Sequence, residues 1–327
     1  MSKSFVSLEA RKPRRPKNQA VLPLRTRARR AGTANVDISS GARLPGVETV
    51  LTPAGRVPKS KVHFVPKGAR VHRTTDSIQI IGADGKVIHS TPVSKPNSTH
   101  ISTPAVVTTE DITSGWNAYT WCESDPDDWP ITNFSTAWAV PDAPSTYDDQ
   151  GIFIGNILST DDSTAMLEPT LQYGESAAGG GEYWSIASWY FDGDEAYYST
   201  LVEVSSGTLL TGIMQLTDFD EDYDWDTDTT TITFYWNCTF SGYPDTSYDI
   251  STTEEFIYAL EGLETYDCTQ DSDLPSGTTK MESIYLQAGF YCPSLSWNTQ
   301  DDATDDIDVE VVTDGSVNGE VDISYPT

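Results

Sequence analysis

The chain has 327 residues and a formal net charge of −29, from 49 acidic and 20 basic side chains. This length can hold one large domain or two ordinary ones. No apolar run approaches the roughly 18 residues of a transmembrane helix, so we expect no membrane partner.

The charge is divided between two parts of the chain. Nineteen of the twenty basic residues lie before residue 96, together with five acids, whereas Lys280 is the one base among the residues that follow. Opposite charges attract at neutral pH, and this attraction fades as carboxylates become protonated. The division therefore predicts a basic inhibitory pro-segment that an acid-adapted domain releases at low pH. A nucleic-acid-binding tail is the competing interpretation; we do not expect a nucleic-acid partner, because an acidic body repels phosphate.

The basic part divides into three segments. Residues 1–60 are rich in Arg, Pro and Ala and have few large apolar side chains, so we expect them to be mostly disordered. Residues 61–95 are expected to form a small β-hairpin pro-segment, because two β-rich runs flank a turn at Gly82–Gly85. Residues 96–112, rich in Ser, Thr and Pro, are expected to be a linker.

Residues 113–327 have the pattern of an all-β domain. Short alternating runs rich in Thr, Val, Ile, Tyr and Trp are separated by Gly, Asp, Ser and Pro. This spacing predicts an acidic, antiparallel two-sheet sandwich, which we expect to be a monomer. One short helix is expected at Thr253–Leu263. Two acidic stretches, Asp218–Asp228 and Asp301–Asp308, are expected to be solvated loops, and Gly179–Gly181 a tight hairpin turn.

Several kinds of chemistry are excluded. All four histidines precede residue 113, so a Ser–His–Asp or Cys–His device confined to the β domain is impossible. The cysteines lack CxxC spacing, and there is no GxGxxG or Walker loop, so we expect neither a metal nor a cofactor. Carboxylates, amides, hydroxyls and aromatic rings remain as the candidate functional groups.

The cellular location is ambiguous. No apolar segment of the kind found in a signal peptide follows the charged N-terminus. The four cysteines at 122, 238, 268 and 292 allow three disulfide pairings, which stay open. We expect an extracellular protein that lacks a recognisable signal peptide, with the cytoplasm as the alternative.

Six short segments resemble, in order and spacing, the strands and turns of the glutamic peptidases called eqolisins. They are Phe134–Pro141, Ile152–Gly155, Ala165–Glu168, Ala187–Tyr190, Val204–Leu209 and Leu260–Glu264. The resemblance implies a concanavalin A-like sandwich and an acid endopeptidase that acts on polypeptides. It also implies a Gln/Glu dyad, in which the glutamate deprotonates a water and the glutamine amide stabilises the oxyanion.

The resemblance carries specific residues over. The catalytic glutamate becomes Glu261, and the position of the glutamine is occupied by Glu168. Phe153, Gln172 and Trp189 become candidate substrate-binding residues; Phe153 stands where the family has Trp, and Gln172 could supply the missing amide. Two carboxyls that face one water would share a proton.

A second function remains open. A concanavalin-like sandwich can bind carbohydrate or another polymer through exposed Trp and Tyr without any catalysis, because fold does not determine function. The peptidase hypothesis differs from it in one geometric requirement: Glu168 and Glu261 must face each other across one sheet.

Overall fold

The computed structural model describes residues 47–93, 115–124, 130–161, 163–225, 228–301 and 306–326. These ranges contain strands and two short 3-10 turns, η2 (Lys59–Lys61) and η3 (Asp271–Asp273), with no α-helix among them. In the part described, no helix is long and apolar enough to cross a membrane. The all-β prediction is confirmed.

The strands form two large sheets and one separate hairpin. The nine-stranded sheet has the order β19 (Asn298–Asp301), β7 (Gly115–Glu123), β17 (Tyr258–Tyr266), β9 (Gly151–Ser159), β10 (Ala165–Ser176), β11 (Gly179–Asp192), β12 (Glu195–Tyr198) and β3 (Val62–Phe64), with β13 (Val202–Glu203) paired to β11. The ten-stranded sheet has the order β20 (Asp308–Thr313), β21 (Val317–Ser324), β18 (Thr278–Ala288), β8 (Ile131–Ala139), β14 (Leu209–Asp224), β15 (Thr229–Phe240), β16 (Tyr243–Thr252), β4 (Arg70–Arg73), β5 (Ser77–Ile81) and β6 (Val87–Pro92). β1 (Thr49–Thr52) and β2 (Gly55–Pro58) make the hairpin.

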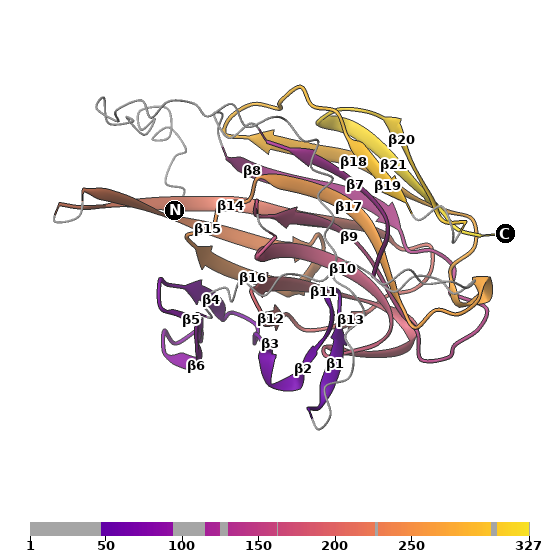
Figure 1. Cartoon of the computed structure of the whole chain (residues 1–327), viewed down its shortest axis with the longest axis horizontal. Coiled ribbons are helices and arrows are strands. Elements are labelled where there is room, and N and C mark those ends of the chain that lie inside the picture. Colours follow the sequence, from indigo (N-terminus) through magenta and orange to yellow (C-terminus); the bar gives the residue numbers. More distant parts are fainter. Residues whose placement is uncertain are drawn as a thin grey trace, which may run out of the picture. The chain divides into compact units, whose positions relative to one another are not determined.

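The two large sheets pack face to face, as Figure 1 shows, with β10 against β14 and β11 against β15. Alternating residues of each strand point into the layer between them, where large apolar side chains such as Trp138, Ile154 and Trp236 are buried. Pairing within both sheets is antiparallel except for β3 with β12 and β4 with β16, which are parallel. The predicted two-sheet sandwich is therefore present.

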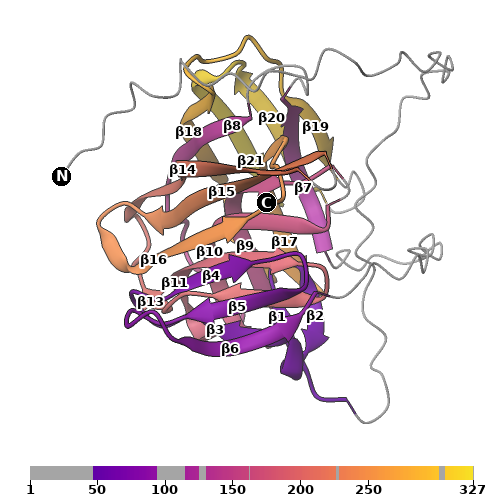
Figure 2. The same cartoon turned by 90° about the vertical axis from the view of Figure 1, so that its left-hand side faces the viewer.

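The basic part of the chain contributes to this sandwich. The expected hairpin at 61–95 is present as β5 and β6, but these strands extend the ten-stranded sheet beyond β4 and β16, as Figure 2 shows. β3 is an edge strand of the other sheet. Val71 and Ile78 are buried in the common core. The sandwich therefore begins well before residue 113, because these strands complete both sheets and cover their core.

The expected disorder of residues 1–60 is wrong for the described residues at the end of that range. β1 and β2 pair as an antiparallel hairpin, and Leu51, Thr52 and Pro53 are buried. Burial of this hairpin against the sandwich stabilises a segment that is too polar to fold alone. Residues 1–46 and the expected linker at 96–112 lie outside the described residues.

The helix expected at Thr253–Leu263 is wrong. Its second half belongs to β17, which pairs with β7 on one side and β9 on the other. Glu254 and Glu255, which suggested the first turn of a helix, precede this strand. A central strand is buried on both faces, and pairing with two neighbours overrides the weak local preference for helix.

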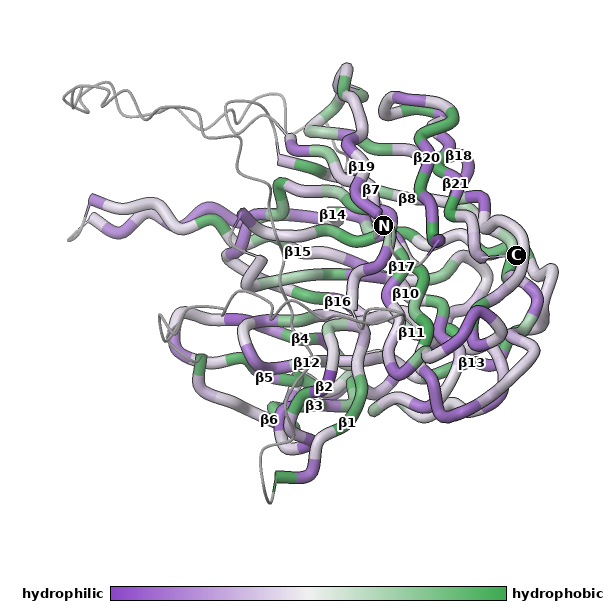
Figure 3. Tube along the Cα trace, turned by 45° about the vertical axis from the view of Figure 1, so that its right-hand side comes forward, coloured by the Kyte–Doolittle hydropathy of each residue, from purple (hydrophilic) through white to green (hydrophobic). Residues whose placement is uncertain are grey.

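The acidic stretch at 218–228 is a ribbon of two strands rather than a loop. β14 continues to Asp224 and β15 begins at Thr229, and Figure 3 shows the outer part of this ribbon in hydrophilic colours. Threonines of β15 stand opposite the acids, and their β-branched side chains favour strand. Gly179–Gly181 likewise begins β11, and the turn itself is formed by Ala177 and Ala178.

No cluster of His, Cys, Asp and Glu among the described residues could hold a metal ion. The four cysteines are all free. Cys122, Cys238 and Cys268 are buried, and Cys292 is exposed.

Candidate functional site

The two glutamates expected to form the dyad lie on opposite faces of the nine-stranded sheet. Leu167 pairs with Leu158, and Leu158 pairs with Ala259, so these three side chains share the face that points into the core. Glu261 is two residues after Ala259 and shares that inner face, whereas Glu168 follows Leu167 and takes the outer face. The structure therefore does not bring Glu168 and Glu261 together.

Glu261 is part of the core between the sheets. Its side chain is fully buried, and Thr136 of β8 in the other sheet donates a hydrogen bond to Oε1. Burial raises the pKa of Glu261 well above its usual value, although the Thr136 hydroxyl opposes this. A buried carboxyl that bridges two packed sheets cannot reach a substrate on the outside.

Glu264, which the sequence analysis did not single out, lies on the outer face with Glu168. It is an odd number of residues from Glu261 and pairs with Phe153, which also points outward. Burial raises the pKa of Glu264 well above its usual value, and the charge of Glu168 raises it further. The structure thus places two buried carboxyls, Glu168 and Glu264, on one face of the sheet, and Glu261 on the other.

Glu168 is almost completely buried on this face. Burial raises its pKa to about 8, against a smaller opposing effect of the Thr170 hydroxyl. Its Oε1 has no hydrogen-bond partner among the described residues. A carboxyl in this environment is protonated at acid and neutral pH and can donate a hydrogen bond.

Gln172 and Phe153 lie in one row with Glu264. Phe153 of β9 pairs with Glu264 on one side and with Gln172 of β10 on the other. The Gln172 amide donates to the carbonyl oxygens of Gly174 (2.9 Å) and Gly179 (2.7 Å), and its Oε1 accepts from Ser176. Gln172 is therefore two strands from Glu264 and four residues along β10 from Glu168, and both its amide hydrogens hold the β10–β11 turn.

Trp189 is the cross-strand neighbour of Glu168. It is fully buried, and its ring lies 5.9 Å from Phe191 and 5.2 Å from Tyr198 between centroids. Ile157 and Leu260 belong to the same apolar cluster. Trp189 therefore forms part of the wall that keeps water away from Glu168, which accounts for the raised pKa.

The turn between β1 and β2 covers this outer face. Leu51 packs against Phe153 and Tyr266, and Ala54 packs against the cluster that contains Trp189. The Tyr266 hydroxyl lies 2.9 Å from the Pro53 carbonyl oxygen and 2.8 Å from Oε2 of Glu264. We refer to Leu51–Gly55 as the covering turn.

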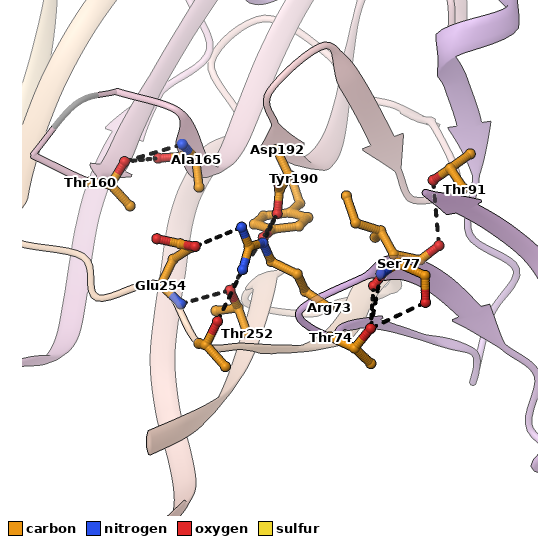
Figure 4. A network of polar contacts seen from close by, with 12 residues as sticks. Arg73, Thr74, Ser77, Thr91, Thr160, Ala165, Tyr190, Asp192, Thr252 and Glu254 are labelled. Carbon is orange, nitrogen blue, oxygen red and sulfur yellow. Dashed lines mark hydrogen bonds and ion pairs between the residues drawn. The ribbon is translucent and has the colours of Figure 1, made fainter. Parts of the chain in front are cut away.

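The covering turn is tied to the rest of the basic region, which binds the sandwich through ion pairs. Arg56 pairs with Asp267 next to Tyr266, and Lys61 pairs with Glu195, which also has a hydrogen-bond contact of 2.7 Å with Nε2 of His63. Arg73 of β4 reaches Asp192 and Glu254, as Figure 4 shows. These contacts connect basic residues before position 96 with acids after it, as the charge division suggested.

Comparison with known proteins gives two kinds of result. No protein-family model and no curated protein matches the sequence. Among solved structures, the structure of this chain is similar to that of a scytalido-glutamic peptidase with a peptide-based transition-state analogue (14% identity, TM-score 0.37). It is also similar to SCP-B, a member of the eqolisin family, in complex with the tripeptide Ala-Ile-His (15% identity, TM-score 0.36). Each alignment covers 65% of this chain and 98% of the other.

The amino-acid sequence does not distinguish Glu264 from Glu261 as the glutamate that shares a face with Glu168. Glu261 and Glu264 both end up buried in the same strand, and they differ in the face to which they point. Separation by three residues places them on opposite faces of a strand, so at most one of them could share a face with Glu168. The sequence contains no alternation in this strand that decides which one.

Proposed function

We propose that the protein is an acid endopeptidase of the glutamic type in which Glu264 and Glu168 form the catalytic pair. The observation that carries the proposal is the placement of two buried carboxyls, Glu168 and Glu264, on one face of the sheet, beneath a turn of peptide chain. Paired acids with separated pKa values are the usual arrangement for acid–base catalysis by carboxyls.

The two carboxyls have different roles in this proposal. When the covering turn leaves, water reaches the site and the effect of burial on both pKa values falls. The pair then loses its first proton readily and retains its second, because two close carboxylates repel each other. Glu168, which ionises first, takes a proton from water as the water oxygen attacks the peptide carbonyl. Glu264, still protonated, donates a hydrogen bond to the oxyanion, and Glu168 then gives its proton to the leaving amine.

A protonated carboxyl is close in shape to a glutamine amide and can donate a hydrogen bond as the amide does. Glu264 can therefore perform the task that the resemblance gives to glutamine, and Glu168, at the glutamine position, takes the role of the base. The pKa of Glu264, which burial and the charge of Glu168 both raise, supports this division. Gln172 holds the neighbouring turn and positions β10 against β11.

The experiment compares isosteric substitutions at pH 3.5 with denatured casein as substrate. We expect Glu264→Gln and Glu168→Gln to lower kcat at least about 100-fold, a range typical of lost acid–base or oxyanion groups. Glu261→Gln is the matched control, since this residue is equally buried but lies on the other face. Each substitution should be made in the wild-type chain and in a Leu51→Ala chain, whose site is easier to open.

Two outcomes would contradict the proposal. If Glu261→Gln abolishes activity in a folded protein while Glu264→Gln does not, the wrong face has been assigned. If neither the wild type nor the Leu51→Ala chain cleaves casein between pH 3 and 6, the non-catalytic sandwich takes its place. For that alternative, Trp225 on the acidic ribbon is the one largely exposed tryptophan in the described residues.

A further inference from the structure

The covering turn occupies a pocket whose shape suits a leucine side chain. Leu51 is 5% exposed and packs between Phe153 and Tyr266. Gly151 forms the floor of this pocket, because a Cβ atom there would lie 2.3 Å from Cδ2 of Leu51. A residue with any side chain at position 151 would therefore collide with the leucine.

The backbone of the turn is held as well. The Ala177 amide donates to the carbonyl oxygen of Leu51 at 2.8 Å, and the Tyr266 hydroxyl donates to that of Pro53. The Thr52 hydroxyl donates to the carbonyl oxygen of Gly55 at 2.8 Å and closes the turn on itself. One apolar pocket and two backbone hydrogen bonds at fixed spacing are elements by which proteins recognise a peptide segment.

We propose that Leu51–Pro53 is an internal ligand of a peptide-binding site, and that the site accepts peptides with a leucine-sized side chain two residues before a carbonyl that Tyr266 binds. The inference rests on the proposed function only for what happens to the bound peptide. Phe153, Tyr266 and Gly151 select the side chain, and Ala177 and Tyr266 set the direction and register of the backbone. The partner is thus an apolar polypeptide segment, and the chain's own turn competes with it.

The anchoring of the turn favours exchange. The ion pairs nearest to it, Arg56–Asp267 and Lys59–Glu48, involve side chains that are between a third and three quarters exposed. Exposed pairs contribute little to stability. Leu51 is the one large apolar side chain that the turn inserts in a pocket, so its removal should loosen the turn without disturbing either large sheet.

The first experiment measures binding by calorimetry at pH 7, away from the acid range proposed for hydrolysis. The probe is acetyl-Val-Leu-Thr-Pro-Ala-amide, a copy of residues 50–54, and the control probe has Asp in place of Leu. We expect full-length Leu51→Ala to bind the leucine probe at least about tenfold more tightly than wild type does. Val57→Ala is the matched control, because Val57 belongs to the same hairpin but does not enter the pocket, and it should behave as wild type.

The second experiment needs no substitution. Arg56 and Lys59 are exposed and follow the covering turn directly. If the leucine probe displaces the turn in the wild-type chain, it should accelerate tryptic cleavage at these two residues several-fold and in a saturable manner, while the Asp probe should not. Equal binding by wild type and Leu51→Ala, or equal effects of the two probes, would overturn the inference.

These results separate the inference from the proposed function. Binding of the leucine probe without hydrolysis of any substrate at acid pH would leave the peptide site in place and remove the peptidase. Hydrolysis of casein that the leucine probe does not inhibit would retain the peptidase and remove the pocket.

Discussion

Glu168 and Glu264 lie on the same outward face of the nine-stranded sheet, and the charge of Glu168 raises the pKa of Glu264. Glu261, three residues earlier than Glu264, points into the core and hydrogen-bonds to Thr136. The side of the sheet, rather than the position in a motif, therefore determines which glutamates can act together.

The first prediction concerns this coupling. Glu168→Gln removes a like charge, so it should lower the pKa of Glu264. Carbon-13 NMR titration of glutamate carboxyls in the full chain would measure the shift. Glu261→Gln is the control and should leave the titration of Glu264 unchanged. An identical titration of Glu264 in the wild type and Glu168→Gln would show that the two carboxyls are independent.

The second prediction concerns the proton between Tyr266 and Glu264. The Tyr266 hydroxyl has one hydrogen and two oxygen neighbours, the carbonyl of Pro53 and Oε2 of Glu264. The carbonyl can only accept, so whenever Tyr266 donates its one hydrogen to the carbonyl, the bond to Glu264 forms only if Glu264 is protonated and donates to Tyr266. Docking of the covering turn is therefore coupled to protonation of Glu264, whose pKa is raised in the docked state.

The sign of this coupling gives a test. Stabilisation of the docked turn by the proton is complete below the pKa of Glu264 in the undocked state, and it is lost as pH rises through the higher pKa of the docked state. Hydrogen exchange at residues 49–58, corrected for intrinsic rates, should show protection that falls as pH rises. Glu264→Gln should flatten this profile, since its amide donates at every pH. Protection that grows with pH would contradict the proton assignment.

This coupling opposes the expectation that acid frees the basic part of the chain. Protonation of Glu264 favours the docked turn, whereas protonation of Asp and Glu partners weakens ion pairs such as Lys61–Glu195. Release at low pH would have to come from the ion pairs. Because β3 to β6 complete both sheets, the segment that can leave without opening the core is the part before Lys59.

The third prediction is that the stability of the protein falls between pH 5 and pH 8. Burial raises the pKa of Glu168, Glu261 and Glu264, so each binds more protons in the folded chain than in the unfolded one over this range. The stabilisation is complete below the unfolded pKa and is lost as pH rises through the folded value, at up to about 1.4 kcal/mol per pH unit for each group. Urea unfolding at several pH values would measure it.

Glu261→Gln isolates one of these contributions. The substitution keeps the shape and can still accept from Thr136, but it has no proton to lose. The variant should show a shallower decline of the free energy of unfolding with pH, and it should exceed the wild type in stability at pH 8. A variant with the same slope as the wild type would show that Glu261 does not titrate in this range.

The two-sheet sandwich could be predicted from the sequence because half-buried strands such as β8 alternate between buried and more exposed residues. The side of the sheet to which each glutamate of the site points could not be predicted. β9 is buried along its whole length, and β17 nearly so, since the covering turn and its neighbours bury the outer face as the second sheet buries the inner one. Without alternation, Glu261 and Glu264 look alike in the sequence. The hairpin at 49–58 was missed for a related reason, because its burial depends on a surface formed some 100 to 200 residues away.

The last prediction concerns how the basic strands are held. Arg73 is largely buried between Asp192 and Glu254, and Asp192 also accepts a hydrogen bond from Tyr190. Arg73→Met should lower the free energy of unfolding by about 3–5 kcal/mol, because it leaves a buried carboxylate without its cation. Lys67→Met is the matched control: Lys67 pairs with Asp245, both are more than half exposed, and the loss should stay below about 1 kcal/mol. Urea unfolding of the full chain at pH 7 would measure both. Equal losses for the two variants would mean that the number of ion pairs, rather than burial at Arg73, determines how firmly the basic strands bind. A small loss for Arg73→Met would show that β4 is held by its apolar residues and its pairing with β16.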